Sequence, residues 1–209
     1  MLLAIDTSAG SSVAVVTTNG EVLAERSSDD PMRHAEVIGS LMVGCLEDAG
    51  VRVADLTGVV AGMGPGPFTG LRIGIAAART FGVGAGLVVH PVVSHDAIAL
   101  DAYSNGSVPP DTALLVVTDA RRRERYWTRY AGLDAAGLPV RTDGPALAKP
   151  DDVPTDDAVR RDATLVPGGA LGRVAALLLA IGGGFAGDEP LYLRSPDVTL
   201  SAGSKRVTA

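Results

Sequence analysis

The sequence predicts an α/β protein of two lobes, each a mixed sheet flanked by helices. Hydrophobic residues make up 46% of the 209 residues and aromatic residues only 4%. Val, Leu, Ile and Ala must therefore fill the core, which is typical of sheets covered by helices. A strand, a polar turn and a second strand open each half of the chain. Between the halves, residues 104–111 (SNGSVPPD) form turns and supply almost no packing side chains, which marks a boundary.

This boundary predicts an N-terminal lobe at residues 1–105 and a C-terminal lobe at residues 106–187. The remaining tail, residues 188–209, contains an apolar anchor at 191–193. Through this anchor the tail can pack back on the N-terminal lobe, while the polar residues beyond it are expected to fray.

The N-terminal lobe should begin with three antiparallel strands. A buried strand at 2–5 ends in a polar turn, and residues 19–20 (Asn-Gly) are a strong hairpin signal. A helix should span residues 31–49, because apolar residues recur on one face and Gly50 follows as a left-handed cap. The other expected elements of this lobe are strands at 12–17, 22–26, 56–63 and 87–89, a helix at 71–83, and a helix at 94–103 that Ser94 would cap.

The C-terminal lobe should repeat the opening pattern, with a buried strand at 114–118, a polar turn at 119–124 and an alternating strand at 125–131. Residues 141–163 are charged and weakly patterned, which indicates a surface loop with one short helix. The remaining expected elements are a strand at 164–166, a turn at 167–169 and an apolar helix at 171–181.

Charge and cysteine content exclude several classes of protein. The net charge of −6 disfavours stand-alone binding of nucleic acid, because an acidic surface gains nothing from the release of counterions. The only cysteine, Cys45, excludes an intrachain disulfide and a cysteine-based metal site, and it favours a reducing compartment. The chain turns polar at Asp6, too early for a signal peptide, and no apolar run reaches the length of a membrane span. We therefore expect a cytoplasmic protein without a membrane partner.

The first candidate site is the turn after the first strand, with Asp6, Thr7 and Ser8. Its backbone N–H and hydroxyl groups can face the oxygens of a phosphate, while the Asp holds a metal ion or a water. The alternative is a hairpin whose Asp and Thr satisfy their own backbone, and spacing alone slightly favours it. Nucleotide or anion binding at these residues would then be vestigial.

The second candidate is the glycine-rich run at residues 62–74. It is not a Walker A loop, because Leu71 stands where Lys is needed, and it misses the dinucleotide fingerprint, because Thr69 replaces the third Gly. It forms a rigid turn leading into a helix, with Thr69 as the expected N-cap, and such a helix N-terminus can bind an anion. Equally, the glycines can serve only to bring strand and helix close together.

The helix that follows carries a stripe of small residues, Gly74, Ala78 and Gly82, at four-residue spacing. The expected neighbouring helix, at residues 31–49, offers Gly39 and Val43. We expect these five residues to form a partner interface, used for self-association when the protein is alone. A close helix contact inside the lobe is the alternative.

The three histidines, His34, His90 and His95, show no HxxxH spacing. A two-histidine metal site on one helix is therefore not expected, and each histidine should have a surface or capping role.

Residues 119–127 place arginines next to aromatics, a combination that can bind a phosphate or stack on a base. In an acidic protein we favour a solvated turn or a partner contact for this segment. No Ser or Cys shows the local signature of an activated nucleophile.

Residues 62–74 (GMGPGPFTGLRIG), together with the LLAIDTS start, closely resemble the bacterial TsaB (YeaZ) family. Further matches are the runs Asp119-Ala120-Arg121, Arg125-Tyr126-Trp127 and PLYLR at 190–194. The resemblance covers nearly the whole chain. It implies the actin/Hsp70/sugar-kinase (ASKHA) fold and a role in making N6-threonylcarbamoyladenosine at position 37 of certain tRNAs.

The resemblance further implies a scaffold without catalytic residues. Members of this family are similar to TsaD, the catalytic subunit, and pair with it; TsaE, an ATPase, joins the pair, and TsaC makes the donor. The expected partners are thus TsaD and TsaE, with a homodimer when the protein is alone and tRNA contacted only through the complex. The interface expected above would be exchanged for TsaD when TsaD is present.

Departures from the catalytic pattern agree with this role. TsaD uses an HxxxH pair for its metal, whereas the comparable segment here has only His95. The second-lobe phosphate loop of such ATPases needs adjacent glycines, but Asp119-Ala120-Arg121 occupies that turn, although Gly168 and Gly169 remain near the nucleoside-facing position. No cofactor or metal is expected, and weak ATP or ADP binding stays open. The alternatives are a small-molecule kinase, which would need two phosphate loops and an Asp base, and a metallopeptidase, which would need the missing histidine.

Overall fold

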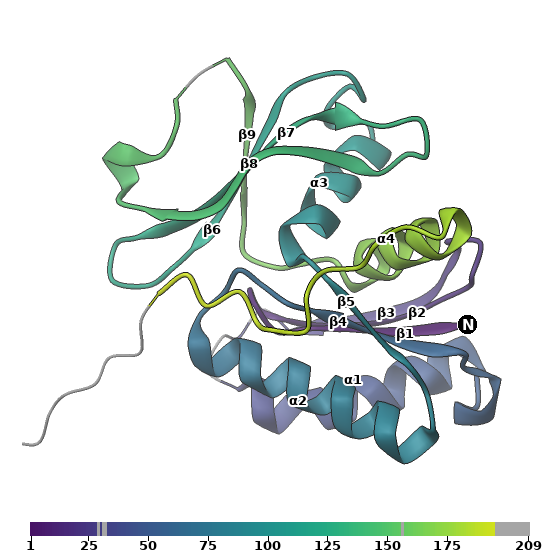
Figure 1. Cartoon of the computed structure of the whole chain (residues 1–209). Helices are drawn as coiled ribbons and strands as arrows, with labels where there is room; N and C mark the ends of the chain where they lie inside the picture. Colours follow the sequence, from purple (N-terminus) through teal and green to yellow (C-terminus); the bar gives the residue numbers. More distant parts are fainter. Residues whose placement is uncertain (29, 31–32, 156, 195–209) are drawn as a thin grey trace, which may run out of the picture.

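The computed structural model describes residues 1–28, 30, 33–155 and 157–194. Figure 1 shows a first sheet with helices on both of its faces and a second sheet above them. Among the described residues, no helix combines the length and the apolar character needed to cross a lipid bilayer.

The first sheet has the strand order β3-β2-β1-β4-β5. Strand β1 pairs antiparallel with β2 and parallel with β4, so the sheet changes from antiparallel to parallel at β1. All residues of β1, β2 and β4 are buried, which explains their nearly continuous apolar sequences. The strands are β1 (Leu2–Asp6), β2 (Ser11–Val16), β3 (Val22–Ser28), β4 (Gly58–Gly62) and β5 (Val89–Val92).

Helices cover both faces of this sheet. On one face lie α1 (His34–Ala49) and α2 (Phe68–Ala85), which pack over a core that contains Leu3, Ile5 and Met63. On the other face lies α4 (Gly168–Ile181), which contacts β1 and β2 and also packs against α3 (Ser94–Ser104). The expected left-handed cap of α1 is confirmed, because Gly50 has a φ of 64°. Residues 31–32, where that helix was expected to start, lie outside the described residues.

The second sheet repeats the start of the first. Its order is β8-β7-β6-β9, in which β6 pairs antiparallel with β7 and parallel with β9, just as β1 does with β2 and β4. One of its faces packs on α3, and the other carries a small apolar cluster around Trp127. The strands are β6 (Leu114–Asp119), β7 (Arg125–Leu133), β8 (Pro139–Ala148) and β9 (Val159–Ala163).

The prediction of a surface loop at residues 141–163 is wrong. This segment contains most of β8, the short 3-10 turn Pro150–Asp152 and β9. Both strands lie at the edges of the second sheet and are largely exposed, so they need no buried apolar row and leave no periodic signal. The strand expected at 164–166 is also absent, because β9 ends at Ala163.

Two expected caps are wrong as well. Helix α2 begins earlier than expected, with Pro67 at the N-cap, so Thr69 lies inside its first turn. Helix α3 is preceded by Val93, so Ser94 is its first residue rather than its cap.

The expected lobe boundaries stay a prediction, but the contacts of α4 and the tail refine them. Helix α4, expected with residues 106–187, packs on the first sheet. The described part of the tail reaches both lobes. The backbone N–H of Leu191 donates to the carbonyl oxygen of Met63 (2.9 Å), and the guanidinium of Arg194 donates to the carbonyl oxygen of Ala120 in the second lobe (3.1 Å). Residues 195–209 lie outside the described residues.

Candidate functional site

The turn between β1 and β2 is buried and internally bonded. Asp6 is 1% exposed, and its Oδ1 accepts hydrogen bonds from the backbone N–H (2.7 Å) and the hydroxyl (2.6 Å) of Ser8. The hydroxyl of Ser94 donates to Asp6 Oδ2 at 2.5 Å and accepts the N–H of Gly64 at 2.9 Å. Burial raises the pKa of Asp6, and these hydrogen bonds oppose that rise in part. The Asp6 carboxylate thus joins three segments of the first lobe.

Thr7 binds the turn to α2. Its hydroxyl donates to the carbonyl oxygen of Gly70 (2.6 Å) and accepts the N–H of Gly74 (2.8 Å). A Cβ added at Gly74 would lie 2.3 Å from Thr7 Oγ1, so only glycine allows the helix this close to the turn. The glycine-rich run therefore has an architectural purpose here.

The expected outward orientation of the small-residue stripe is wrong. Gly74, Ala78 and Gly82 are all buried, and the stripe faces the sheet; a Cβ at Gly82 would lie 2.7 Å from the Val89 side chain. The four-residue spacing gave the correct face, but a stripe of small residues suits close packing on a strand as well as on a helix. The α1 residues differ: Val43 is 58% exposed, and a Cβ added at Gly39 would meet no atom within 4 Å. Their use as an interface stays a prediction.

The glycine pair at the start of α4 binds a carboxylate of the same chain. The N–H of Gly168 donates to Glu25 Oε1 at 2.8 Å, and Gly169 also bonds this carboxylate. Desolvation raises the pKa of Glu25, and these N–H groups oppose that rise. A carboxylate at this position complements the helix dipole. Both glycines face β2 and β3, and vestigial nucleotide binding at Gly168 and Gly169 stays a prediction.

The expectation of a surface or capping role is wrong for His95. Its ring is fully buried, with Nδ1 2.7 Å from Thr128 Oγ1 and Nε2 3.0 Å from Thr118 Oγ1, so it joins α3 to β6 and β7. Burial lowers the pKa of His95 to about 3. His34 is also buried and lies 2.7 Å from Ser11 Oγ. Among the described residues, no three His, Cys, Asp or Glu side chains gather as a metal site.

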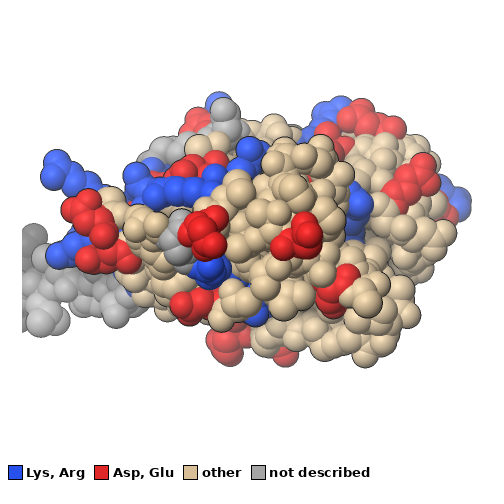
Figure 2. All heavy atoms as spheres, turned by 90° about the horizontal axis from the view of Figure 1, so that it is seen from above, with Lys and Arg blue, Asp and Glu red and all other residues tan. Residues whose placement is uncertain are grey.

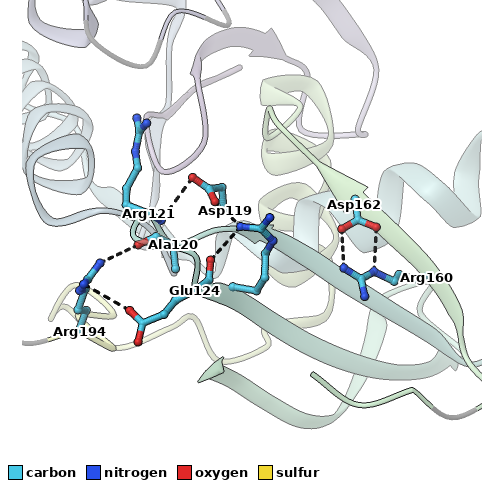
Figure 3. Close-up of polar contacts among 8 residues, drawn as sticks. Asp119, Ala120, Arg121, Glu124, Arg160, Asp162 and Arg194 are labelled. Atoms are coloured by element: carbon cyan, nitrogen blue, oxygen red, sulfur yellow. Dashed lines mark hydrogen bonds and ion pairs between the residues drawn. The ribbon is translucent and has the colours of Figure 1, made fainter. Parts of the chain in front are cut away.

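The turn between β6 and β7 is exposed and rich in arginine. Arg121, Arg122 and Arg123 are consecutive residues with positive φ angles of 65°, 50° and 62°. Asp119, at the start of the turn, pairs with Arg125 at 2.5 Å. Figure 3 shows Arg121 pointing away from Asp119 and toward the first lobe, and Arg194 from the tail reaching Ala120 and Glu124.

The two turns face each other across a cleft of about 520 Å³ between the lobes. Of the predicted anion-site residues, Ser8 and Thr69 line this cleft. Asp6 and Thr7 lie buried, and Gly168 and Gly169 do not line the cleft. Its lining from both lobes is Ser8, Ala9, Gly10, His34, Pro67, Thr69, Gly70, Ile73, Asp119, Arg121, Ala163 and Thr164.

Two residues of the site were missed by sequence reasoning. Glu25 lies in a strand, and only its position beside α4 gives it a role. Thr128 was recognised as part of an alternating strand, but the pattern does not reveal its bond to His95. Neither residue belongs to a local motif, so no signal in the sequence could have found it.

Comparisons with known proteins place these observations in a family context. The model of the family described as TsaD: tRNA N6-adenosine threonylcarbamoyltransferase matches residues 21–146. An uncharacterized protein of Mycobacterium tuberculosis is 44% identical over 154 residues, which cover 73% of this chain and 66% of that protein. The tRNA threonylcarbamoyladenosine biosynthesis protein TsaB of Escherichia coli is 32% identical over 151 residues, 72% of this chain and 63% of that protein. The matched region thus spans just under two thirds of these relatives.

Solved structures agree. A Pseudomonas aeruginosa protein described as similar to peptidase YEAZ has a TM-score of 0.77 and 26% identity, over 92% of this chain and 99% of that chain. YeaZ from the same organism has a TM-score of 0.72 and 25% identity, over 87% of this chain and 92% of that chain. The expected two-lobed α/β fold and the resemblance to TsaB (YeaZ) are confirmed.

Proposed function

The chain belongs to the TsaD family of tRNA N6-adenosine threonylcarbamoyltransferases, and we propose that within this family it is a non-catalytic subunit of the TsaB type. In this role it pairs with TsaD while TsaD forms N6-threonylcarbamoyladenosine at position 37 of tRNA. TsaE joins the pair, tRNA is bound through the assembled complex, and the protein acts in the cytoplasm.

The observation that carries this proposal is the carboxylate of Glu25 at the N-terminus of α4. A helix N-terminus binds a phosphate through unpaired N–H groups. Here the N–H of Gly168 is already bonded to Glu25, 2.8 Å away, and a phosphate in the same place would meet a like charge. A kinase of this fold would need that position and a glycine-containing loop at residues 119–124, so the kinase alternative has less support.

The buried groups of the first lobe point the same way. The Asp6 carboxylate is saturated by Ser8 and Ser94, and His95 is held between two threonines in the neutral form. Neither side chain reaches the cleft, so neither is placed to act on a substrate.

The outward face of α1 and α2 is the surface that we propose for TsaD, and for a second copy of this chain when TsaD is absent. Val43 on α1 and Val83 on α2 are 58% and 84% exposed, and Gly39 leaves space for an approaching side chain. The proposed surface includes Gly39 and Val43 of the predicted interface. It does not include the buried stripe of α2 and uses the exposed side of that helix instead. Exposed apolar side chains on neighbouring helices are a typical docking surface.

Co-purification with the cognate TsaD, with and without ATP, tests the proposal. The wild-type chain should pair, and Val43→Arg or Gly39→Trp should abolish pairing while the melting temperature stays unchanged. Val140→Arg is the matched control. Val140 is 40% exposed on β8 in the other lobe, so this variant should still pair with TsaD. A wild-type chain that never binds TsaD, or that consumes ATP with a sugar or pantothenate, would overturn the proposed function.

A further inference from the structure

The most unusual surface feature is the arginine hairpin, Arg121–Arg123 between β6 and β7. The protein as a whole is acidic, with a net charge of −6, and Figure 2 shows basic and acidic side chains next to one another over the face drawn there. In the hairpin, three consecutive arginines are exposed with left-handed backbone angles. Such angles are unfavourable for residues with a Cβ and concentrate at functional sites.

Two hydrogen bonds hold this backbone in place. The N–H of Ala120 donates to Glu124 O at 3.1 Å, and the N–H of Glu124 donates to Arg121 O at 3.0 Å. The three arginine side chains therefore project from a loop whose backbone is held by hydrogen bonds. A fixed loop loses less conformational freedom when its side chains bind a ligand.

Among the described residues, neither acidic residue of the hairpin forms an ion pair with Arg121 or Arg123. Asp119 is paired with Arg125, and Glu124 with Arg194 at 3.4 Å, so each carboxylate has a cation of its own from outside the tip. Within the described residues, the guanidinium of Arg121 forms no hydrogen bond or ion pair, and Figure 3 shows it extended toward the first lobe. Arg121 and Arg123 thus offer positive charge to a ligand, and Arg121 lines the cleft.

A cavity of about 380 Å³ adjoins the hairpin and adds aromatic surface. Phe68 and Tyr192 form its aromatic wall, with ring centroids 4.8 Å apart. The guanidinium of Arg72 lies over the Phe68 ring, 3.8 Å from its centroid, and Tyr126 lines the cavity but is only 1% exposed. Arg121 and Arg122 also line the cavity. Tyr192 is 38% exposed, so part of its ring remains free to contact a ligand.

We propose that the arginine hairpin and this cavity bind RNA: Arg121 and Arg123 contact backbone phosphates, and an unpaired nucleotide places its base against Phe68 and Tyr192. Arginines beside exposed aromatic rings suit a single-stranded nucleic acid, which offers phosphates and base faces together. An acidic peptide would use the arginines but not the aromatic wall. The proposal rests on the proposed function, which brings this chain to tRNA inside the TsaD complex. It also names the part of this subunit that the tRNA touches.

The test uses the reconstituted complex with TsaD and an unmodified transcript of a cognate tRNA. Filter binding from about 50 to about 200 mM salt gives the affinity and its salt dependence. In the double variant Arg121→Ala/Arg123→Ala, the negative slope of log K against log salt should become shallower, by roughly 0.7–0.9 for each phosphate that the variant no longer neutralises. Arg160→Ala is the matched control, since Arg160 is on the same sheet but is paired with Asp162 at 2.9 Å, as Figure 3 shows.

A second pair of variants tests the aromatic wall. Tyr192→Ala should weaken tRNA binding on the order of tenfold with little change in salt slope, whereas Tyr192→Phe keeps the ring and should bind nearly as the wild type does. Equal effects of Tyr192→Ala and Tyr192→Phe would argue against stacking and overturn that part of the site.

Each remaining outcome is decisive. Unchanged affinity and slope in the arginine double variant overturn the inference. If that variant instead binds TsaD poorly, and the small amount of complex that still forms binds tRNA normally, the hairpin is a protein-binding element and the inference is wrong. If the wild-type chain itself fails to pair with TsaD, the proposed function fails and the inference falls with it.

Discussion

The β1–β2 turn and the β6–β7 turn occupy equivalent places in two sheets of the same topology, yet they differ in almost every physical property. Each begins with an Asp at the end of a buried strand. Asp6 is 1% exposed and bonded to Ser8 and Ser94, whereas the side chain of Asp119 is 57% exposed and paired with Arg125. The first turn is part of the core, and the second is a charged surface.

The packing around each turn explains the difference. Helix α2 presses its glycines onto the first turn, and α3 closes it through Ser94. The second turn is separated from the N-terminal end of α2 by cavities, and its direct contact is with the tail. An equivalent place in a repeated topology therefore does not imply an equivalent chemical role. Substitutions in and around the first turn should cost far more stability than substitutions in the second.

Gly74→Leu should have the largest effect. A Cβ at this position would lie 2.3 Å from Thr7 Oγ1, and a leucine side chain would force α2 away from the turn. We expect a loss of about 3 kcal/mol or more in the free energy of unfolding, seen as loss of helical circular dichroism or a much lower melting temperature. A variant that folds normally but fails to bind TsaD would contradict the inward orientation of the stripe.

Asp6→Ala should follow. It leaves the donors of Ser8 and Ser94 without an acceptor in a buried site, which should cost about 3 kcal/mol in urea-induced unfolding. Asp6→Asn keeps one acceptor and should cost less. Modification activity of the complex should fall only as far as folded protein is lost. A fully stable Asp6→Ala variant with a thousandfold loss of rate would instead make Asp6 catalytic.

Asp6 also predicts a pH effect. Because burial raises its pKa in the folded state, the folded protein binds the proton more tightly than the unfolded chain does. The contribution of Asp6 to stability should therefore decrease as the pH rises from the unfolded pKa through the folded one. In Asp6→Asn this decrease should be missing, as measured by unfolding free energies across acidic pH.

His95 predicts a dependence with the opposite sign. Its pKa is lowered to about 3 in the folded state, while the unfolded chain takes up a proton near the ordinary value of 6.5. Its contribution should be complete above pH 6.5 and decrease toward pH 3, by up to about 1.4 kcal/mol for each pH unit. His95→Gln should be less stable at neutral pH and should lack this component of the acid slope. An identical slope in both proteins would show that the ring is not held neutral.

Asp119→Ala should have the smallest effect. The residue is exposed and forms one ion pair, so its removal should change stability by roughly 0.2–1 kcal/mol. Thermal melting of Asp119→Ala beside Asp6→Ala is the direct measurement of the contrast between the two turns. A loss as large as that of Asp6→Ala would mean that the left-handed loop depends on Asp119.

Local patterns in the sequence by themselves determined where the buried strands lie along the chain and the repeated strand–turn–strand start of each half. They also determined the cap at Gly50 and the glycine-rich run that carries the family resemblance. These features depend on periodicity and turn chemistry, which neighbouring residues specify. Only the tertiary structure decided which face of α2 turns inward, that Glu25 occupies the N-terminus of α4, that His95 lies between two threonines, and that residues 139–163 add two edge strands. Each of these depends on a partner distant in the sequence, and exposed edge strands are defined by backbone pairing, which leaves no periodic trace in the side chains.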